Sequence, residues 1–440
     1  MRKYIYKLLI LSALFTGFVS CEVKEFSDLN NPEVDAFREN LTRGDLQDLV
    51  GGILYSMRDR LGTYYDDLGV IGREFWRFSS SDPRFTGDLL GKENAVLDNN
   101  TFYITAPWAS RYRTVKNANL ILEFLDGQDL SAQFSAEEIS ATKGFLKTFI
   151  AYELLLNLNL TYENGIRLDV SDENNLGPFV SYTEALSGIR AMLEDGASDL
   201  AGGGDEFPFI LSSGFSGFDT PSSFLEVNKA ISARVAAYQG DDAAVLAFLE
   251  DSFLDLDGDL YTGIYYNFSS DQTDILNPMY FPVEATTAGA RIVQPSFVTD
   301  AEEGDNRLDK IAMRSEPLTL DGLTGEYAVY RYKSNTDAIP IIRNEELILL
   351  YAEANIGIDP AETVEALNII RAKAGIGPYT GPETTEALTE EMLEQRRYSL
   401  YAEGHRWIDM RRYDMLDELP LDRAGDDVFV QFPIPLTENQ

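Results

Sequence analysis

The sequence predicts an all-α protein built from helical hairpins, with long irregular loops and a few short strands. Amphipathic runs with helical spacing recur along the 440 residues, and capping patterns mark where several of them begin. The segments between them are rich in Gly, Ser, Asp and Pro. Hydrophobic residues make up 44% of the chain, which is enough to bury a large core. We therefore expect residues 41–440 to form a single helical domain.

Residues 135–159 carry the clearest helical pattern. Ser135 and Glu138 have capping-box spacing, and apolar residues follow on one face. Residues 228–253 form two runs broken at "QGDD", and residues 343–376 form another pair, in which Asp359, Pro360 and Glu362 mark the start of the second helix. Such pairs resemble tetratricopeptide-type hairpins. The run "YAVYRY", residues 327–332, predicts a short strand.

The charge of the chain narrows the possible partners. It has 36 Lys and Arg against 73 Asp and Glu, a formal net charge of −37. Such a field repels phosphate backbones and anionic polysaccharides, so we expect no nucleic acid partner and favour a neutral ligand. A local basic pocket could override this net field.

Few residues offer catalytic chemistry. His405 is the only histidine, which argues against histidine-dependent triads and multi-histidine metal sites. No phosphate-binding glycine loop or nucleophile elbow is present. "DLDGD", Asp255 to Asp259, suggests calcium, but a solvated turn explains it better because the EF-hand spacing is absent. We therefore expect no catalytic residues, no cofactor and no metal, although a carboxylate pair of a glycoside hydrolase remains a weaker alternative.

The first twenty residues predict a signal peptide. Basic Arg2, Lys3 and Lys7 precede an apolar run that is too short to span a bilayer. Cys21, the only cysteine, follows directly after Ser20 and resembles the lipid-accepting cysteine of bacterial lipoproteins. We expect lipidation at Cys21, with residues 21–40 as a polar tether. An ordinary secretory signal with an incidental cysteine is the alternative.

Residues 394–416, "EQRRYSLYAEGHRWIDMRRYDML", combine arginines, a tryptophan and the single histidine in a helical pattern. This composition could form a binding site. The stripe of Leu400, Gly404, Trp407 and Ile408 instead predicts a structural helix, with Trp407 in the core. Glu403, Arg406 and Asp409 are spaced to pair along its surface.

This stretch resembles the C-terminal signature of the SusD/RagB family of outer-membrane nutrient-binding lipoproteins. Gln395 and Ser399 depart from it, since the family usually has Glu at both. The matching residues are Arg396, Arg397, Leu400, Glu403, Gly404, Arg406, Trp407, Asp409 and Arg412, with upstream blocks at Arg343, Glu346, Leu349, Ala352, Glu353 and Ala354 and at Asn368, Arg371, Ala374 and Gly375.

The resemblance implies a helical body with tetratricopeptide-like hairpins, held by lipid on the outer face of the outer membrane. It also implies a non-enzymatic role in polysaccharide utilisation. The protein would capture an oligosaccharide and deliver it to a SusC-type TonB-dependent transporter for nutrient uptake. A peptide-binding, RagB-like capture protein is the alternative.

A sugar-binding site needs an exposed aromatic plate with polar neighbours. Trp76 and Trp108 are the predicted plates, in segments whose composition suggests loops. Core packing is the alternative for each aromatic side chain. The predicted ligand-binding residues are Trp76, Phe78, Trp108, Phe75, Arg77, Asp82 and Arg84.

Overall fold

The computed structural model describes residues 34–172 and 174–439. The chain divides into two units, residues 1–41 and 42–440. In the first, helix α2 (Val34–Glu39) lies within the segment predicted as a tether. The predicted signal peptide and Cys21 lie outside the described residues, so both remain predictions.

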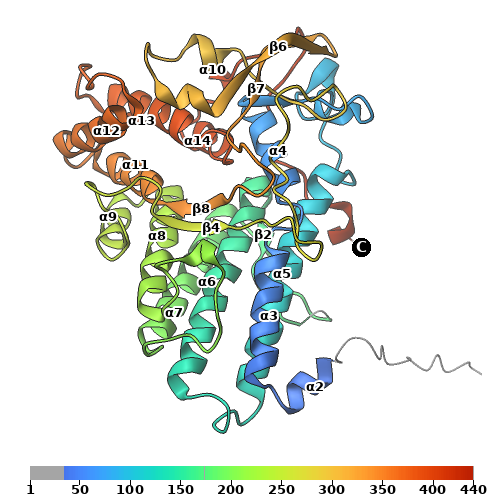
Figure 1. The fold of residues 1–440 in the computed structure, drawn as a ribbon, viewed down its shortest axis with the longest axis vertical. Helices are drawn as coiled ribbons and strands as arrows, with labels where there is room; N and C mark the ends of the chain where they lie inside the picture. Colours follow the sequence, from blue (N-terminus) through green and yellow to red (C-terminus); the bar gives the residue numbers. More distant parts are fainter. Residues whose placement is uncertain (1–33, 173, 440) are drawn as a thin grey trace, which may run out of the picture. The chain divides into compact units, whose positions relative to one another are not determined.

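The first half of this unit is an array of helices in which consecutive long members pack side by side (Figure 1). Ser135 begins α6 with a complete capping box, and the break at "QGDD" separates α8 from α9, as predicted. None of the helices within the described ranges is long and apolar enough to span a bilayer. The helices are α3 (Arg43–Ser56), α4 (Leu61–Ile71), α5 (Phe102–Gly127), α6 (Ala136–Thr161), α7 (Tyr182–Ala201), α8 (Pro221–Gln239) and α9 (Asp242–Glu250).

A second helical group follows near the C-terminus, where α11, α12 and α13 enclose an apolar cluster. Asp359 caps α12 as predicted, but Glu362 accepts a hydrogen bond from the Tyr351 hydroxyl instead of completing a capping box. Helices α11 and α12 pack against each other as a pair. Whether such pairs are of the tetratricopeptide type stays a prediction. The helices are α10 (Ser296–Thr299), α11 (Asn344–Asn355), α12 (Pro360–Ala374), α13 (Thr385–Ser399) and α14 (Arg406–Arg412).

Short 3₁₀ helices connect these elements. They are η1 (Pro83–Phe85), η2 (Lys92–Asn94), η3 (Tyr162–Asn164), η4 (Ser213–Phe215), η5 (Asn306–Lys310), η6 (Leu416–Glu418) and η7 (Leu436–Asn439).

The β structure is more extensive than the sequence suggested. One antiparallel sheet has the order β1-β5-β7-β6, and two further pairs join β2 to β3 and β4 to β8. The predicted strand at 327–332 lies partly in β7, which begins at Leu323 and ends at Val329. The strands are β1 (Phe75–Arg77), β2 (Ile166–Arg167), β3 (Phe179–Val180), β4 (Gly263–Tyr266), β5 (Arg291–Val293), β6 (Ile311–Leu320), β7 (Leu323–Val329) and β8 (Ile339–Arg343).

The hairpin β6–β7 turns through Asp321 and Gly322, whose φ angles are 52° and 78°. A two-residue loop with two positive φ values matches the right-handed twist of the flanking strands, and Asp-Gly is a favoured sequence for it. The hairpin therefore places its two ends about 30 Å apart, since each strand residue adds about 3.3 Å.

The prediction of one continuous helix over 394–416 is wrong. Helix α13 ends at Ser399 and α14 begins at Arg406, with Ala402 and Gly404 in left-handed conformations between them. A Cβ at Gly404 would lie 2.9 Å from Cδ1 of Leu68, so the chain turns where glycine allows close packing.

Charged residues of the signature are buried and pair with one another. Arg396 Nε lies 2.7 Å from Asp409 Oδ2, Arg343 pairs with Glu403, and Arg412 pairs with Glu353. The predicted surface pairing of Glu403 and Asp409 is therefore wrong. The partners come from separate sequence blocks, so the ion pairs hold α11, α13 and α14 together. The charges of the signature therefore have a structural role.

Trp407 is fully buried, as predicted, and its indole N–H donates to the Phe429 carbonyl at 2.8 Å. Phe429 belongs to the C-terminal strap, defined here as residues 420–438, which runs back over elements from early in the chain. The strap bonds Arg73 through the Asp427 carbonyl, and Phe432 N–H donates to Leu160 O at 2.8 Å. The last part of the sequence thus completes the packing of the first.

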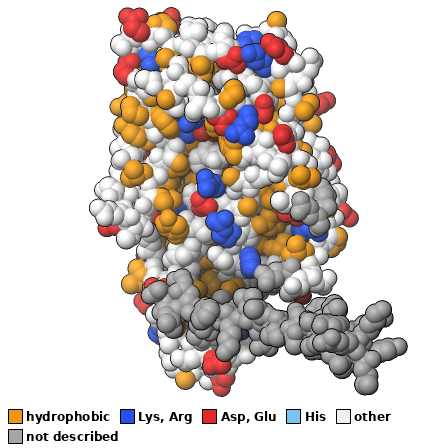
Figure 2. Space-filling view, turned by 90° about the vertical axis from the view of Figure 1, so that its right-hand side faces the viewer, with side chains coloured by type: hydrophobic (Ala, Val, Ile, Leu, Met, Phe, Trp, Pro, Cys, Tyr) orange, Lys and Arg blue, Asp and Glu red, His pale blue; other side chains and the backbone are white. Residues whose placement is uncertain are grey.

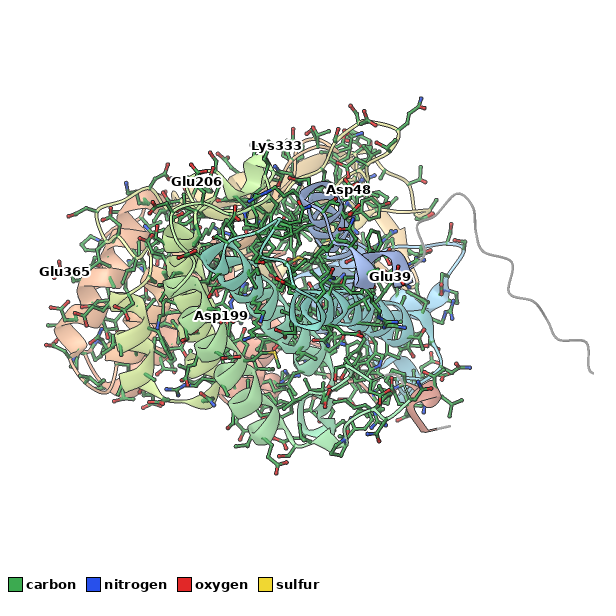
Figure 3. The ribbon with its side chains drawn as sticks, turned by 90° about the horizontal axis from the view of Figure 1, so that it is seen from below. Glu39, Asp48, Asp199, Glu206, Lys333 and Glu365 are labelled. Atoms are coloured by element: carbon green, nitrogen blue, oxygen red, sulfur yellow. The ribbon has the colours of Figure 1, made fainter. Side chains whose placement is uncertain are left out.

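The negative charge is spread over the surface. Figure 3 labels Asp48 of α3, Asp199 of α7, Glu206 and Glu365 of α12, which come from separate parts of the unit. On the face in Figure 2, basic, acidic and hydrophobic side chains are interspersed. Local environments can therefore differ in sign from the net charge.

Candidate functional site

The predicted aromatic plates lie in the core. Trp76 is 3% exposed and Trp108 is 2% exposed, while Phe75 and Phe78 are fully buried. The loop assignment is wrong, because Trp76 belongs to strand β1 and Trp108 to helix α5. Helix α5 also contains Pro107, directly before Trp108, so a proline does not end the helix here.

Both indole N–H groups bond to the C-terminal strap. Trp76 Nε1 donates to Asp422 Oδ2 at 2.7 Å, and Trp108 Nε1 donates to Glu438 Oε1 at 2.9 Å. The Trp76 ring also stacks on Phe78, with centroids 6.1 Å apart. A buried and hydrogen-bonded indole has no free face for a sugar ring, so this geometry gives the two tryptophans a structural role.

The charged residues predicted beside the tryptophans, Arg77, Asp82 and Arg84, are at least partly exposed. Arg77 Nε lies 3.3 Å from Asp66 Oδ2, and its guanidinium covers the rings of Phe85 and Phe281 at 5.3 and 4.8 Å. Asp82 and Arg84 form an ion pair at 2.8 Å. Hydrogen bonding from Arg84 lowers the pKa of Asp82, which keeps the carboxylate charged.

Three partly exposed rings form what we call the phenylalanine surface: Phe85, Phe102 and Phe281. The centroids of Phe85 and Phe102 are 5.0 Å apart, and the Arg84 guanidinium lies 4.7 Å from the Phe102 centroid. Phe102 and Phe281 could not be predicted from the sequence, because their proximity to Phe85 depends on the tertiary fold. The turn at Asp82 and Pro83, next to several aromatic residues, was the available signal for Phe85.

A polar pocket of about 460 Å³ lies beside this region. It is formed by the segment after β1 and by the turn of the β6–β7 hairpin. Phe85 shares the η1 turn with Pro83, which lines the pocket. The lining residues are Ser79, Ser80, Pro83, Thr86, Gly87, Asp88, Lys92, Leu320 and Asp321.

Asp321 anchors this pocket. It accepts hydrogen bonds from Lys92, from the Thr86 hydroxyl at 3.1 Å and from Arg423 at 2.7 Å. Burial alone would raise the pKa of Asp321, but these three donors outweigh it and lower the pKa. Burial raises the pKa of Asp88, which also accepts a bond from the Tyr103 hydroxyl. The pocket thus presents hydroxyls, carboxylates and an ammonium group around a fixed charge.

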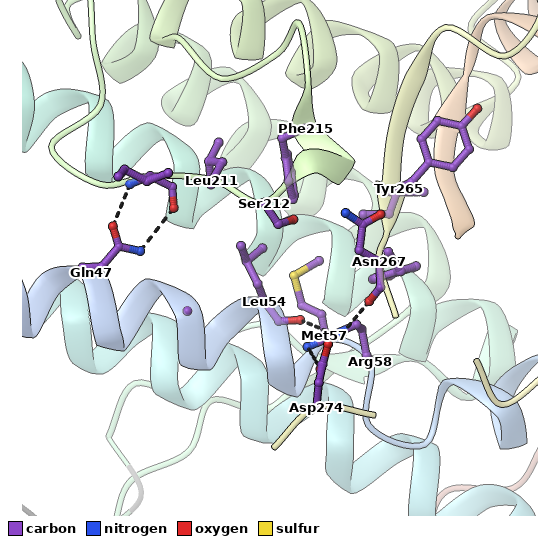
Figure 4. A pocket seen from close by; sticks show the side chains of 14 residues that line it. Gln47, Leu54, Met57, Arg58, Leu211, Ser212, Phe215, Tyr265, Asn267 and Asp274 are labelled. Carbon is purple, nitrogen blue, oxygen red and sulfur yellow. Dashed lines mark hydrogen bonds and ion pairs between the residues drawn. The ribbon is translucent and has the colours of Figure 1, made fainter. Parts of the chain in front are cut away.

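A second cavity, the apolar pocket, has a volume of about 490 Å³ (Figure 4). Many of its polar groups bond to one another. Gln47 makes two hydrogen bonds with the Ile210 backbone, and Arg58 pairs with Asp274 at 2.8 Å. Its remaining lining is mainly apolar, so it suits an apolar group better than a sugar. The apolar members are Leu54, Met57, Ile210, Leu211, Phe215 and Ile341.

Comparison with known families and structures identifies the architecture. Residues 322–434 match the model of the SusD family, SusD_RagB. A SusD superfamily protein from Bacteroides vulgatus ATCC 8482 is 18% identical, with a TM-score of 0.67 over 91% of this chain and 97% of its own. The chain has the SusD fold. The resemblance inferred from the signature residues is confirmed.

Two further SusD-like structures cover nearly the same region. A laminarin-binding SusD-like protein is 18% identical, with a TM-score of 0.64 over 91% of this chain and 98% of its own. Surface glycan-binding protein A from Bacteroides thetaiotaomicron, solved in complex with laminarihexaose, is 14% identical. Its TM-score is 0.67 over 90% of this chain and 97% of its own. A search of curated proteins found no match.

The acidic residues at 255–259 form backbone turns. Asp255 Oδ1 accepts the N–H of Asp257, and Asp259 Oδ1 accepts that of Tyr261. Within residues 34–172 and 174–439, no three His, Cys, Asp or Glu side chains are grouped as metal ligands. These carboxylates organise turns of the backbone.

Proposed function

We propose that this protein is a cell-surface lipoprotein that binds an oligosaccharide and delivers it, chemically unchanged, to a SusC-type TonB-dependent transporter. The SusD fold and the ligands of two similar proteins, laminarin and laminarihexaose, support glycan binding. The observation that carries the proposal is the polar pocket next to the phenylalanine surface. The phenylalanine surface supplies aromatic rings for the C–H face of a sugar, and the polar pocket supplies hydrogen-bonding groups for its hydroxyls.

The chemistry of the two surfaces is complementary to a pyranose ring. Its C–H face packs on an aromatic ring, while hydroxyls such as that of Ser80 and carboxylates such as Asp88 bond its hydroxyl groups. These groups remain in contact with solvent, so the net gain per bond is small. We expect affinities of about micromolar to millimolar, roughly −4 to −8 kcal/mol, which suit capture followed by release.

A glycan array followed by calorimetry tests this site, with laminarihexaose as the first probe. Phe85→Ala should weaken binding about tenfold, corresponding to about 1.4 kcal/mol, because one stacking ring is lost. Ser80→Ala should weaken it by a smaller factor. Ile210→Ala, at an exposed residue of the apolar pocket, is the matched control and should bind like the parent.

The site is misplaced if the Phe85 and Ser80 variants bind every array ligand as the parent does. The proposal of binding without chemistry is wrong if the purified protein shortens the oligosaccharide during incubation.

Peptide capture is the second candidate, and the apolar pocket is the observation that favours it. An extended peptide could place an apolar side chain there, against residues such as Ile210. A peptide pull-down with the same variants separates the two functions. Peptide binding that is lost in Ile210→Asp, together with an empty glycan array, would replace the glycan proposal.

A further inference from the structure

A third cavity, the basic pocket, differs in charge from the rest of the molecule. It has a volume of about 350 Å³ and lies where η5, the segment after β7 and the end of α12 meet. Five basic residues line it against two acidic ones, Asp309 and Glu345. This excess is local, since the whole chain has 73 acidic and 36 basic residues. The basic residues are Arg307, Lys310, Arg331, Lys333 and Lys373.

Two of the basic residues form a fixed inner wall. Arg307 is 7% exposed, and its guanidinium pairs with Asp305 at 2.7 Å. Lys310 Nζ donates to the carbonyls of Tyr398 and Ser399, each at 2.6 Å, at the C-terminal end of α13. Burial lowers the pKa of Lys310 to about 7, and the nearby guanidiniums of Arg331 and Arg343 act in the same direction. The carboxylates of Glu345 and Glu403 oppose this shift. The inner wall is therefore largely neutralised within the protein, and the positive charge available to a ligand comes from the outer basic residues.

The outer basic residues have donors to spare. Arg331 bonds Glu403 through Nε at 3.0 Å, and within the described ranges its two terminal nitrogens have no side-chain hydrogen-bond partner. Lys333 and Lys373 are exposed, and neither has a carboxylate within ion-pair distance among the described residues. Four lysines elsewhere each have such a partner, namely Lys92, Lys143, Lys147 and Lys229.

An apolar edge completes the pocket. Tyr261 is 59% exposed, and Leu260 and Ile370 also line the cavity. An exposed aromatic ring beside free cationic donors fits a sugar that carries a charged oxyanion. The ring packs against Tyr261 while the oxyanion accepts bonds from the lysines.

We propose that the basic pocket binds an acidic sugar unit, whose carboxylate or sulfate is held by Lys333, Lys373 and Arg331. This inference rests on the proposed glycan-binding function and adds a second, charge-selective subsite to it. The basic pocket includes Lys310 before β6, and the polar pocket includes Asp321 after β6. The two sites therefore lie at opposite ends of the hairpin, about 30 Å apart along a ten-residue strand.

Calorimetry with four probes tests the proposal: hexagalacturonate, a sulfated galactan hexasaccharide, neutral laminarihexaose and inorganic sulfate. The test variant is Lys333→Gln/Lys373→Gln, whose side chains are exposed and form no ion pair with the described residues, so that the fold is retained. The control is Lys143→Gln/Lys229→Gln, which removes the same charge from lysines outside the pocket.

At least one acidic hexasaccharide should bind the parent, and its affinity should fall at least tenfold in the test variant but less than twofold in the control. Binding should weaken as salt increases, because exposed charges are screened. The uronate and sulfate probes identify which oxyanion is preferred. Laminarihexaose should bind all three proteins equally.

The proposal is overturned if neither acidic probe binds the parent, or if both double variants lose affinity equally. Full competition by inorganic sulfate at equal concentration would also overturn it, because the sugar would then play no part. Lysine-dependent binding of an acidic probe without any binding of laminarihexaose would support this subsite and contradict the polar pocket.

Discussion

Trp76 shows how a single side chain joins distant parts of the sequence. It is buried in β1 and its N–H donates to Asp422 in the strap. Trp76→Ala should lower the free energy of unfolding by about 3–5 kcal/mol, the range for large core truncations. Trp76→Phe should cost less, since it retains an aromatic ring but loses the hydrogen bond. Urea unfolding followed by circular dichroism measures both, and an unchanged midpoint for the alanine variant would contradict the buried position.

His405 should make the protein sensitive to acid. Burial, followed by Arg234 and Arg396, lowers its pKa to about 3 from 6.5, although Asp409 and Glu403 oppose the shift. Between these two pH values the unfolded chain binds more protons at this residue than the folded protein does. Its contribution to stability is therefore fully present above about pH 6.5 and is lost as the pH falls toward 3.

The test is the pH dependence of unfolding in His405→Gln, which cannot be protonated. Between about pH 6 and 4, the parent should lose up to about 1.4 kcal/mol per pH unit more than the variant does. Measurements at about pH 8 give the baseline effect of the substitution itself. Parallel curves across the acidic range would show that His405 is not the responsible group.

At the scale of elements, Gly404 determines the break between α13 and α14. Its φ of +81° is unfavourable for a side chain, and a Cβ would meet Leu68 and Tyr65 at 2.9 and 3.1 Å. Gly404→Ala should therefore reduce the free energy of unfolding by about 1–3 kcal/mol.

Gly52 is the matched control, since it lies within α3 and a Cβ there has no neighbour within 4 Å. Gly52→Ala should stabilise the protein by about 0.5–1 kcal/mol. Thermal or urea unfolding compares the two. If both substitutions change stability in the same direction, the turn at Gly404 is not the constraint described here.

Elements with strong local signals were predictable from the sequence. Ser135 and Asp359 begin helices because caps act within one turn of the backbone. The turn at Gly404 was missed because a stripe of apolar residues continues through it, and only contacts with α4 reveal why it bends. The long β6 strand was missed for a similar reason, since its pairing with β7 stabilises a segment of weak local preference.

At the scale of the whole molecule, the predicted lipid on Cys21 determines where the protein acts. Cys21→Ala should remove the anchor and release the protein from the outer-membrane fraction, while the fold of residues 42–440 is retained. Membrane fractionation and protease accessibility of intact cells measure this. Unchanged fractionation of the variant would contradict lipidation at this residue.

The candidate sites were only partly predictable at this scale. The sequence identified the segment from Phe75 to Arg84, but it selected the buried rings instead of the exposed ones. Alternation along a strand shows that neighbours face opposite ways, but it does not show which face is covered. Phe281 and Asp321 join this region only in three dimensions. The basic pocket likewise collects residues from five separate segments, so no local motif marks it.

The contacts of the C-terminal strap can form only late in synthesis. Asp422 and Glu438 bond tryptophans that precede them by 346 and 330 positions. During synthesis the early helices therefore lack these partners until nearly all of the chain has been made. Such long-range closure slows folding. For a chain that carries the predicted signal peptide, closure by the last segment favours passage across a membrane before the native structure is complete.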